Sequence, residues 1–393
     1  MKQPSAPYVL WLPSWYPNKM DPFDGDFIQR HAKAVSLHKK IHVIFIKADE
    51  EGRVTNGSQE EFIPKENLTE QIIYFKKSVS FFGRINSFFK WIKLLKKTVG
   101  AYIDENGEPE LVHVHIALRA GIIARWIKRK WGIPYVVTEQ WGGYLPEAKE
   151  KLSDLPIYLQ ILWRRIMREA TSISVVSLYL GQCIKKRLPG ISFNVIPNVV
   201  DTNIFKLIYS ERNNITSFIH VSLLNYQKNV DDIVRAMNIL KKEGLQFRLH
   251  IFGPRNDDLS KLVNDLNLQD EIAFHGEVPQ DELARFVQRS DALILYSRYE
   301  TFGCVIIEAL ACGKPVILSD LPVMHENTLE GVNAVFAENE NPVALSEKLK
   351  WFMQNRTKFD SVEIASRAAL RYNYSQVGKE FANWYEQTLQ TQR

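Results

Sequence analysis

Two glutamates, Glu300 and Glu308, are separated by seven residues and frame a segment that contains Gly303. The apolar run 292–295 before them predicts a buried strand, and the apolar pattern over 304–311 predicts a helix that carries the second glutamate. In a parallel α/β sheet, the loop between such a strand and helix lies at the carboxyl edge of the sheet, where ligands bind. A glycine there lets the first N–H groups of the helix approach an anion closely. The segment therefore predicts a phosphate at the helix start, with a carboxylate on each side.

The residues from Glu300 to Val316 read ETFGCVIIEALACGKPV, which resembles the E-x7-E segment of the retaining, nucleotide-sugar-dependent glycosyltransferases of family 4. Proteins of that family have the two-domain GT-B fold. The resemblance implies that Glu308 holds the ribose hydroxyls of the donor. It also implies that Glu300, the candidate catalytic residue, lies beside the transferred sugar, where it positions the sugar or stabilises a developing positive charge. The backbone N–H groups of the intervening segment would bind the donor, which makes donor-binding candidates of Thr301, Phe302 and Gly303.

A lysine, Lys228, stands just before the helical pattern 230–241, where a cation can pair with a diphosphate at the same helix start. The family often has GRLxxxKG in this loop. Lys228 matches the lysine of that motif, but Leu223 stands in place of the arginine, so one cationic contact is missing. A solvated surface lysine is the alternative interpretation of Lys228.

Three further donor-side candidates lie in later loops of the same half. Gly253 ends the predicted strand 247–252. In the family, the loop that corresponds to 275–278 wraps the nucleotide base, so His275 and Val278 are candidates for binding the base through backbone atoms. Glu326 resembles a glutamate that follows a Pro-Val strand in the family, and it is equally well explained as a carboxylate at a helix start.

Four residues of the first half are candidates for the acceptor or sugar side. Gly25 precedes a helical pattern and could approach a phosphate or an acceptor, although a turn without a ligand explains it equally well. His115 ends a predicted strand, where an ordinary buried strand histidine is the alternative. Gln140 stands where the family commonly has histidine, and it can hydrogen-bond a sugar hydroxyl but cannot carry a proton. Asn198 begins a segment that resembles the family's PNGVDxxxF hinge, with Val199 replacing the glycine.

The order of the predicted strands and helices indicates an α/β protein, with two doubly wound, Rossmann-like domains facing across a cleft. We expect an acceptor-side domain over residues 1–200, a nucleotide-sugar domain over 201–372, and a helix over 373–393 that crosses back to the first domain. The polar segment 199–212 is the expected hinge, and closure about it would exclude water. Residues 51–69 are weakly patterned and are expected to form a surface excursion.

Composition excludes several function classes. The net charge of +5 gives no general nucleic-acid signature. The three cysteines form no metal pattern, and no Asp-x-Asp pair is placed beside the expected diphosphate, so neither a metal nor another cofactor is expected. The low, odd cysteine count fits a reducing cytoplasm. No apolar stretch reaches the length of a membrane span or of a signal peptide's apolar region.

A basic, aromatic stretch over 76–102 has seven Lys or Arg residues and no acidic residue. Its apolar residues fall at helical spacing with cations opposite, so it predicts an amphipathic helix. Such a helix either packs on the sheet or lies on an anionic membrane surface, and the two roles are compatible. The second role would place the protein at the inner face of the cytoplasmic membrane.

The sequence therefore predicts a retaining glycosyltransferase. It would move a hexose from a nucleotide-sugar, UDP-linked rather than GDP-linked, to a glycan or lipid-linked acceptor in surface polysaccharide or lipopolysaccharide synthesis. One alternative is a nucleotide-sugar epimerase on the same fold, which needs no acceptor. A second alternative is a non-catalytic sugar- or nucleotide-binding protein, which Gln140 and Leu223 favour and the pair Glu300 and Glu308 disfavours.

Overall fold

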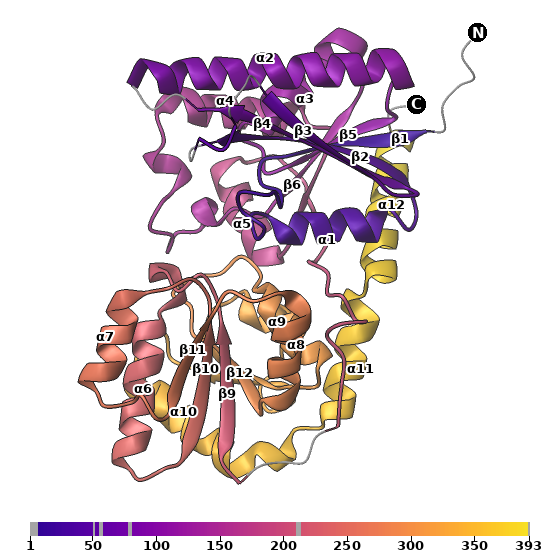
Figure 1. Cartoon of the computed structure of the whole chain (residues 1–393). Coiled ribbons are helices and arrows are strands. Elements are labelled where there is room, and N and C mark those ends of the chain that lie inside the picture. Colours follow the sequence, from indigo (N-terminus) through magenta and orange to yellow (C-terminus); the bar gives the residue numbers. More distant parts are fainter. Residues whose placement is uncertain (1–6, 50–51, 55–57, 78–80, 210–213, 392–393) are drawn as a thin grey trace.

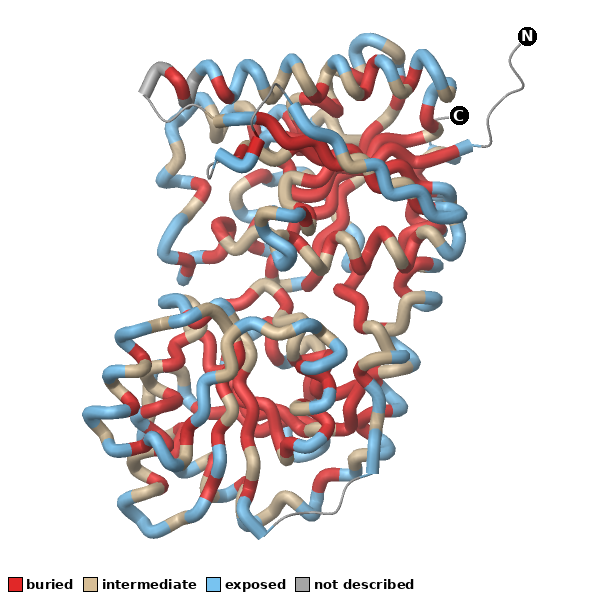
Figure 2. The backbone as a smooth tube through the Cα atoms, viewed as in Figure 1, coloured by how far each residue is buried: buried red, intermediate tan, exposed pale blue. Residues whose placement is uncertain are grey.

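The computed structural model describes residues 7–49, 52–54, 58–77, 81–209 and 214–391. Two lobes, each built on a mainly parallel sheet, stand one above the other with the chain crossing between them along one side (Figure 1). This arrangement confirms the predicted pair of Rossmann-like α/β domains. The central strands of both sheets are buried, whereas the exposed residues gather on the outer helices, the loops and the sheet edges (Figure 2).

The first lobe has an eight-stranded sheet in the order β3-β4-β2-β1-β5-β6-β7-β8, in which the β3–β4 pair alone is antiparallel. Its strands are β1 (Tyr8–Pro13), β2 (Lys40–Asp49), β3 (Ser58–Pro64), β4 (Leu68–Lys76), β5 (Leu111–His115), β6 (Tyr135–Glu139), β7 (Ser172–Val175) and β8 (Asn194–Val195). The connecting helices are α1 (Asp26–Val35), α2 (Phe81–Asn106), α3 (Ala120–Trp131), α4 (Ile157–Glu169) and α5 (Leu178–Arg187). Strands β1, β5 and β6 are buried throughout, as central parallel strands covered on both faces must be.

The second lobe has a six-stranded parallel sheet in the order β11-β10-β9-β12-β13-β14. Its strands are β9 (Thr216–Val221), β10 (Phe247–Phe252), β11 (Ile272–Gly276), β12 (Ala292–Leu295), β13 (Val316–Ser319) and β14 (Ala334–Ala337). The helices are α6 (Val230–Lys242), α7 (Asp257–Asp265), α8 (Gln280–Arg289), α9 (Cys304–Ala311), α10 (Pro342–Asn355) and α11 (Ser361–Tyr372). The strand order reverses beside β9 and β12, so the loops after these two strands meet at the switch point of the sheet.

The last helix, α12 (Tyr374–Gln390), leaves the second lobe and packs on α1 of the first (Figure 1). Phe381 and Tyr385 are fully buried among first-lobe residues. The contact is close at Gly378, where a Cβ atom would come within 2.1 Å of the Ala34 carbonyl oxygen. Beside the crossing, the Val200 N–H donates to the Tyr372 carbonyl over 2.9 Å, which joins the two segments that connect the lobes.

The segment 51–69 is not wholly the surface excursion that we expected, because it contains β3 and the start of β4. Strand β3 pairs with β4 alone and exposes nearly every side chain, so it lacks the period-2 apolar pattern of a half-buried strand. Strand β14 was also missed, because a buried run of four residues gives too little pattern to separate it from a loop.

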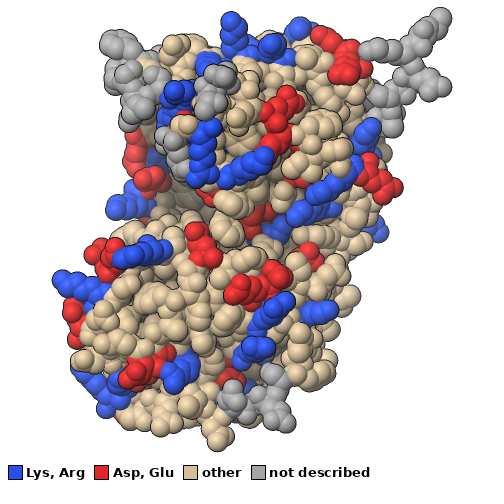
Figure 3. Space-filling view, in the orientation of Figure 1, with Lys and Arg blue, Asp and Glu red and all other residues tan. Residues whose placement is uncertain are grey.

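The basic stretch forms α2, which lies along the top of the first lobe (Figure 1). Leu95, Val99 and Ile103 are buried against the sheet, whereas Phe88 and Phe89 are exposed. Basic side chains lie at several places along the top of the lobe, with acidic side chains at one end (Figure 3). Among the described residues, no helix combines the length and the apolar content needed to cross a membrane.

Candidate active site

An ion pair between Lys228 and Glu300 lies at the switch point of the second sheet. Lys228 comes from the loop after β9 and Glu300 from the loop after β12, so the parallel strand order brings them together across 72 positions of sequence. The same oxygen of Glu300, Oε1, accepts a hydrogen bond from Ser297 Oγ over 3.1 Å. The carboxylate is only 4% exposed, so its orientation is fixed by these two donors.

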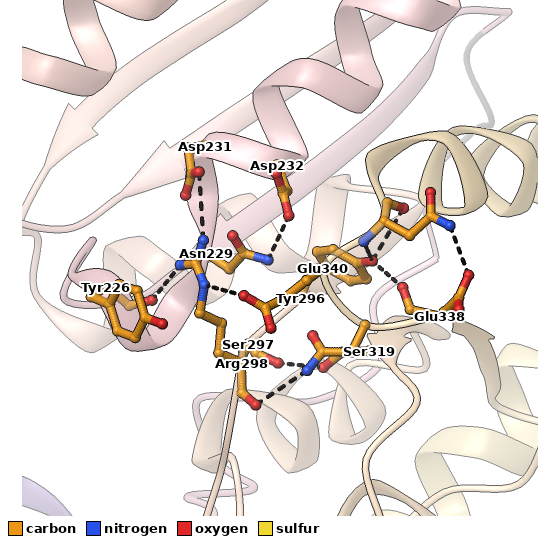
Figure 4. A network of polar contacts seen from close by, with 12 residues as sticks. Tyr226, Asn229, Asp231, Asp232, Tyr296, Ser297, Arg298, Ser319, Glu338 and Glu340 are labelled. Carbon is orange, nitrogen blue, oxygen red and sulfur yellow. Dashed lines mark hydrogen bonds and ion pairs between the residues drawn. The ribbon is translucent and has the colours of Figure 1, made fainter. Parts of the chain in front are cut away.

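Arg298 ties these two loops together (Figure 4). Its Nη1 donates to the Tyr226 carbonyl over 2.6 Å, and its backbone N–H donates to the Gln227 carbonyl over 2.8 Å. Its guanidinium carbon stands 4.4 Å from the centroid of the Tyr226 ring, and its Nε donates to Glu340 over 2.9 Å. Asn229, in the left-handed region with φ 51°, ends the turn and donates to Asp232. The turn that carries Lys228 is therefore held at both ends.

Glu308 forms a buried ion pair with Arg30 of the first lobe, with 2.5 Å between Glu308 Oε1 and Arg30 Nη1. Arg30 Nη2 also contacts Asp26 over 3.0 Å, and Asp26 accepts from Gln280 Nε2 of α8 over 3.0 Å. Burial raises the pKa of Glu308, an effect that Arg30 opposes. Burial opposes the charge of Arg30, but Asp26 and Glu308 raise its pKa and keep the guanidinium charged. The predicted ribose carboxylate therefore meets a cation from the opposite lobe.

Gly303 begins α9 with φ 81°, a backbone conformation that a side chain would strain. The carbonyl of Thr301 accepts a hydrogen bond from Ser177 Oγ of the first lobe over 2.7 Å. The ring of Phe302 is buried beside Tyr372, so this residue can face a donor only through its backbone. The helix start thus offers backbone N–H groups and a bare glycine, as an anion site requires.

Gly253, His275 and Val278 lie on or just after the neighbouring strands β10 and β11. Gly253 approaches the β9 loop so closely that a Cβ atom would stand 2.1 Å from the Ser222 carbonyl oxygen. The half-buried ring of His275 stacks on Phe252 with 4.6 Å between centroids, and its Nε2 lies 2.9 Å from His250 Nδ1. Burial lowers the pKa of His275. Val278 is half-buried in the loop that follows.

Gly25 caps α1 in the left-handed region, with φ 66°. A Cβ atom there would come within 2.7 Å of the Trp15 backbone, so glycine is required sterically. The position of Gly25 sets where α1 begins, and therefore where Arg30 stands. Packing explains the glycine without a ligand, and its approach to a phosphate stays a prediction.

His115, Gln140 and Asn198 are each at least nine-tenths buried at the cleft edge of the first sheet. Within the described residues, both ring nitrogens of His115, the amide nitrogen of Gln140 and the amide oxygen of Asn198 lack a hydrogen-bond partner. The ring of His115 lies between Trp11 and His113, with centroids 4.2 and 4.0 Å away. Buried polar groups normally have partners, so this edge can both donate hydrogen bonds to a ligand or water, from Gln140 Nε2, and accept them, at Asn198 Oδ1.

Sequence reasoning missed Glu139, the fully buried carboxylate at the end of β6. Its Oε1 accepts from the Ala117 N–H over 2.9 Å and from the Tyr144 hydroxyl over 2.6 Å. Burial raises the pKa of Glu139 to about 7, although these bonds act against the rise. The bond to Ala117 holds a strained loop, because Ile116 next to it has φ 67°, rare for a β-branched residue. The sequence did contain a signal for Glu139, since it is a carboxylate at the end of an apolar predicted strand.

Arg30 and Ser177 were missed as well, because their partners come from the other lobe. Glu326 proves to be a helix-start carboxylate, since it accepts from the N–H groups of Leu178 and Tyr179 over 2.6 and 2.7 Å. The helix is α5 of the first lobe, so this contact also joins the lobes. In the part of the chain that the structure describes, no group of His, Cys, Asp and Glu is arranged to hold a metal ion.

Two family models match adjacent parts of the chain. The model described as Glycosyltransferase Family 4 matches residues 37–204, and the model described as Glycosyl transferases group 1 matches residues 202–373. The chain belongs to the group 1 glycosyltransferases. This family assignment confirms the resemblance that the E-x7-E segment indicates.

A relative of similar length is an uncharacterized glycosyltransferase of Methanocaldococcus jannaschii, 26% identical over 348 residues, which cover 88% of this chain and 89% of the relative. Among solved structures, the sucrose-phosphate synthase of Thermosynechococcus elongatus superposes with a TM-score of 0.81 at 16% identity, covering 98% of this chain and 100% of that one. HepE of Anabaena, in complex with UDP and glucose, gives a TM-score of 0.71 at 14% identity, with 97% and 100% covered. These likenesses confirm the GT-B fold of this glycosyltransferase.

Proposed function

We propose that this group 1 glycosyltransferase moves a hexose, with retention of configuration, from a nucleotide-sugar on the second lobe to an acceptor held against the first. The observation that carries the proposal is the Lys228–Glu300 pair, set at the switch point beside the glycine that begins α9. A cation, a buried carboxylate and the N–H groups of a helix start are the set that a sugar diphosphate needs.

Sugar transfer separates charge, and each group has a part in stabilising it. Negative charge grows on the departing diphosphate, where Lys228 and the N–H groups at Gly303 can neutralise it. Positive charge grows on the anomeric carbon, beside which the carboxylate of Glu300 is already oriented by Ser297. Such fixed groups require little reorganisation during the reaction, which is why they lower the barrier effectively.

The ribose site at Glu308 shares its carboxylate with Arg30. Arg30 already bonds Glu308 Oε1, so a ribose hydroxyl on this carboxylate either binds beside the guanidinium or takes its place. Arg30 keeps its second contact with Asp26, four positions away on the same helix, and so remains a charged neighbour of the donor. Donor binding is therefore coupled to the contact between the lobes.

The donor class can be tested with a thermal-shift panel of UDP, GDP, ADP and CMP. We expect UDP to give the largest shift, a preference supported by the UDP complex of HepE. A ligand at one hundred times its Kd stabilises a protein by about 2.7 kcal/mol. Glu308→Ala should abolish the shift, whereas Glu347→Ala, at an exposed position of α10, should preserve it. No shift with any nucleotide would contradict the proposal.

Product analysis tests the chemistry itself. With the matching nucleotide-sugar, wild-type protein should form a glycoside whose anomeric configuration, read by NMR, equals that of the donor. A changed sugar nucleotide formed without acceptor would support the epimerase alternative instead. Because no metal is expected to take part, EDTA should leave transfer unchanged.

We further propose that the acceptor is lipid-linked, within surface polysaccharide or lipopolysaccharide synthesis. The support is α2, where exposed Phe88 and Phe89 stand near the exposed lysines Lys90 and Lys93. Aromatic and cationic side chains together favour an anionic interface. Vesicles with phosphatidylglycerol should bind the protein, and vesicles of phosphatidylcholine alone should not. Replacing both phenylalanines by serine should release it, and Lys261→Glu, on an exposed site of α7, should not.

A further inference from the structure

Arg30 is a buried arginine of the first lobe with one unused hydrogen-bond donor. Its side chain is 6% exposed, its Nη1 donates to Glu308, and its Nη2 donates to Asp26. The Nε–H group is buried and has no hydrogen-bond partner among the described residues. A buried donor without a partner costs free energy, and the cost is larger for a charged group. The Nε–H group is therefore available to an oxygen atom of a ligand.

Arg30 stands beside the start of α9, although it belongs to α1. Helix α1 lies at the base of the first lobe and faces the upper end of the second (Figure 1). Burial raises the pKa of the Cys304 thiol to about 12, and the positive charge of Arg30 acts against this rise. Cys304 is the first residue of α9 and directly follows Gly303. The charge of Arg30 thus acts at the helix start where the phosphate is expected.

The second lobe presents more negative than positive charge at this place. Lys228 carries one positive charge and is already paired with Glu300. Glu308 adds a second buried carboxylate on the same helix that begins at Gly303. A diphosphate brings further negative charges, and like charges repel strongly where water is excluded. The site therefore needs a second cation to balance a bound diphosphate.

Two other cations near the switch point are less suited to this part. Arg298 is engaged elsewhere, because its Nη1 donates to the Tyr226 carbonyl and its Nε to Glu340 (Figure 4). Lys149 of the first lobe stands 5.2 Å from the centroid of the Tyr226 ring, but it is exposed. Water and salt screen an exposed charge, whereas the buried guanidinium of Arg30 is screened much less.

Arg30 is also fixed before any ligand binds. Asp26 lies four positions earlier on α1, and Gln280 of α8 donates to Asp26 over 3.0 Å. Gly25, for which the packing leaves no alternative, sets the start of the helix. Asp26 and Glu308 hold the side chain from two sides and keep it charged. A cation held in this way needs little reorganisation when an anion arrives.

We propose that Arg30 binds the diphosphate of the donor from the opposite lobe, as a second cation beside Lys228. Its Nε–H group donates to a phosphate oxygen while Nη1 and Nη2 keep their bonds to Glu308 and Asp26. The inference rests on the proposed transferase function and adds a first-lobe residue to its donor site. The complete phosphate site then exists only when the two lobes are together, and a donor on an open protein lacks this cation.

Calorimetric titration with UDP and with uridine tests the proposal, because the two ligands differ only in the diphosphate. Arg30→Lys keeps a positive charge beside Glu308 but removes the Nε–H group and the planar fork. It should weaken UDP roughly fivefold and leave uridine within about twofold of wild type. Arg30→Gln removes the charge as well and should weaken UDP roughly thirtyfold. Lys149→Gln is the matched first-lobe control and should bind UDP within about twofold of wild type.

A measurement on the wild-type protein detects the contact directly. In protein with isotope-labelled arginine, the NMR signal of the Arg30 Nε–H group is assigned by its absence from the spectrum of Arg30→Lys. This signal should move downfield when UDP binds, because the group gains a charged acceptor, and it should not do so with uridine. The result does not depend on the stability of any variant that lacks the positive charge.

The outcomes separate this proposal from the function on which it rests. Equal losses of UDP and uridine in Arg30→Lys would mean that Arg30 only positions Glu308, and would overturn the proposal. An unmoved Nε–H signal, or unchanged UDP affinity in both Arg30 variants, would overturn it too. A loss of UDP in Lys149→Gln alone would assign the second cation to Lys149 instead. Absence of UDP binding by the wild type would contradict the transferase proposal itself, and this one with it.

Discussion

The two lobes bring different chemistry to their shared cleft. The second lobe presents Lys228, Glu300 and Glu308, which are charged groups in ion pairs. The first presents His115, Gln140 and other buried groups that are neutral, since burial lowers the pKa of His115 well below its usual value. A diphosphate needs fixed charge, whereas a sugar hydroxyl needs neutral donors and acceptors. This contrast matches what a donor side and an acceptor side require. Arg30 is a charged residue of the first lobe that reaches a carboxylate of the second.

Acidification should unfold the lobes separately, and this is the largest effect that we expect. Burial lowers the pKa of His31 and His42 in the first lobe to about 4, and it lowers the pKa values of His113 and His115 further. These groups stay neutral in the folded state while the unfolded chain takes up protons, so stability falls as the pH drops from 6.5 towards 4. For His31 and His42, a depression from 6.5 to about 4 is worth roughly 3 kcal/mol each.

Two other groups enter this balance. The raised pKa of Glu139, about 7, acts in the opposite sense, because its protonated form is favoured in the folded state and stability rises as the pH falls from 7 to 4.5. The stabilisation from Glu139 offsets the loss of stability that one buried histidine causes over this pH range. Of the described residues in the second lobe, His220 is the one fully buried histidine. Hydrogen exchange followed by mass spectrometry, corrected for intrinsic rates, should show the first lobe losing protection near pH 5 before the second. Loss of protection in both lobes at the same pH would contradict the proposed difference between the lobes in acid stability.

Arg30→Met should lower the free energy of unfolding by about 3 kcal/mol, because Glu308 and Asp26 would be left buried without their cation. Denaturant unfolding measures it. The double variant Arg30→Met with Glu308→Gln should recover part of the loss, since the uncompensated charge is gone. Additive losses in the double-mutant cycle would show that the two residues do not interact.

Lys228→Ala should weaken the preferred nucleoside diphosphate about thirtyfold, which is the loss of one charge-assisted bond of about 2 kcal/mol. The matching nucleoside, which has no phosphate, should bind the variant and the wild type equally. Calorimetric titration of both ligands provides the comparison. An equal loss for the nucleoside would mean that Lys228 acts on the loop and not on phosphate.

Leu223→Arg should have the smallest effect, a two- to fivefold tighter diphosphate, since an exposed cation gains less than 1 kcal/mol. Leu223 is 61% exposed, so the longer side chain costs little packing. Leu223→Gln is the neutral control. The gain should shrink at high salt, and a gain that persists there would contradict an electrostatic cause.

Local patterns were enough to predict the central strands and the segment that carries Glu300 and Glu308, because burial on both sides of a parallel strand leaves a continuous apolar run. Contacts between the lobes could not be predicted in this way. Arg30 meets Glu308 across 278 positions of sequence, and only the setting of the lobes brings them together. The burial that raises the pKa of Glu139 likewise depends on its surroundings, and β3 lacks a pattern because an edge strand need not have one.

The double crossing between the lobes restricts how they can move. One segment leaves the first lobe near Val200, the other returns near Tyr372, and a hydrogen bond of 2.9 Å joins them. Two connecting segments joined side by side favour rotation of one lobe relative to the other about a single hinge axis. They resist twisting and sliding of the lobes. The cleft between the lobes therefore opens mainly by rotation about this one axis. Cutting the chain between α11 and α12 would remove one of the two connections and so release motions that the pair resists.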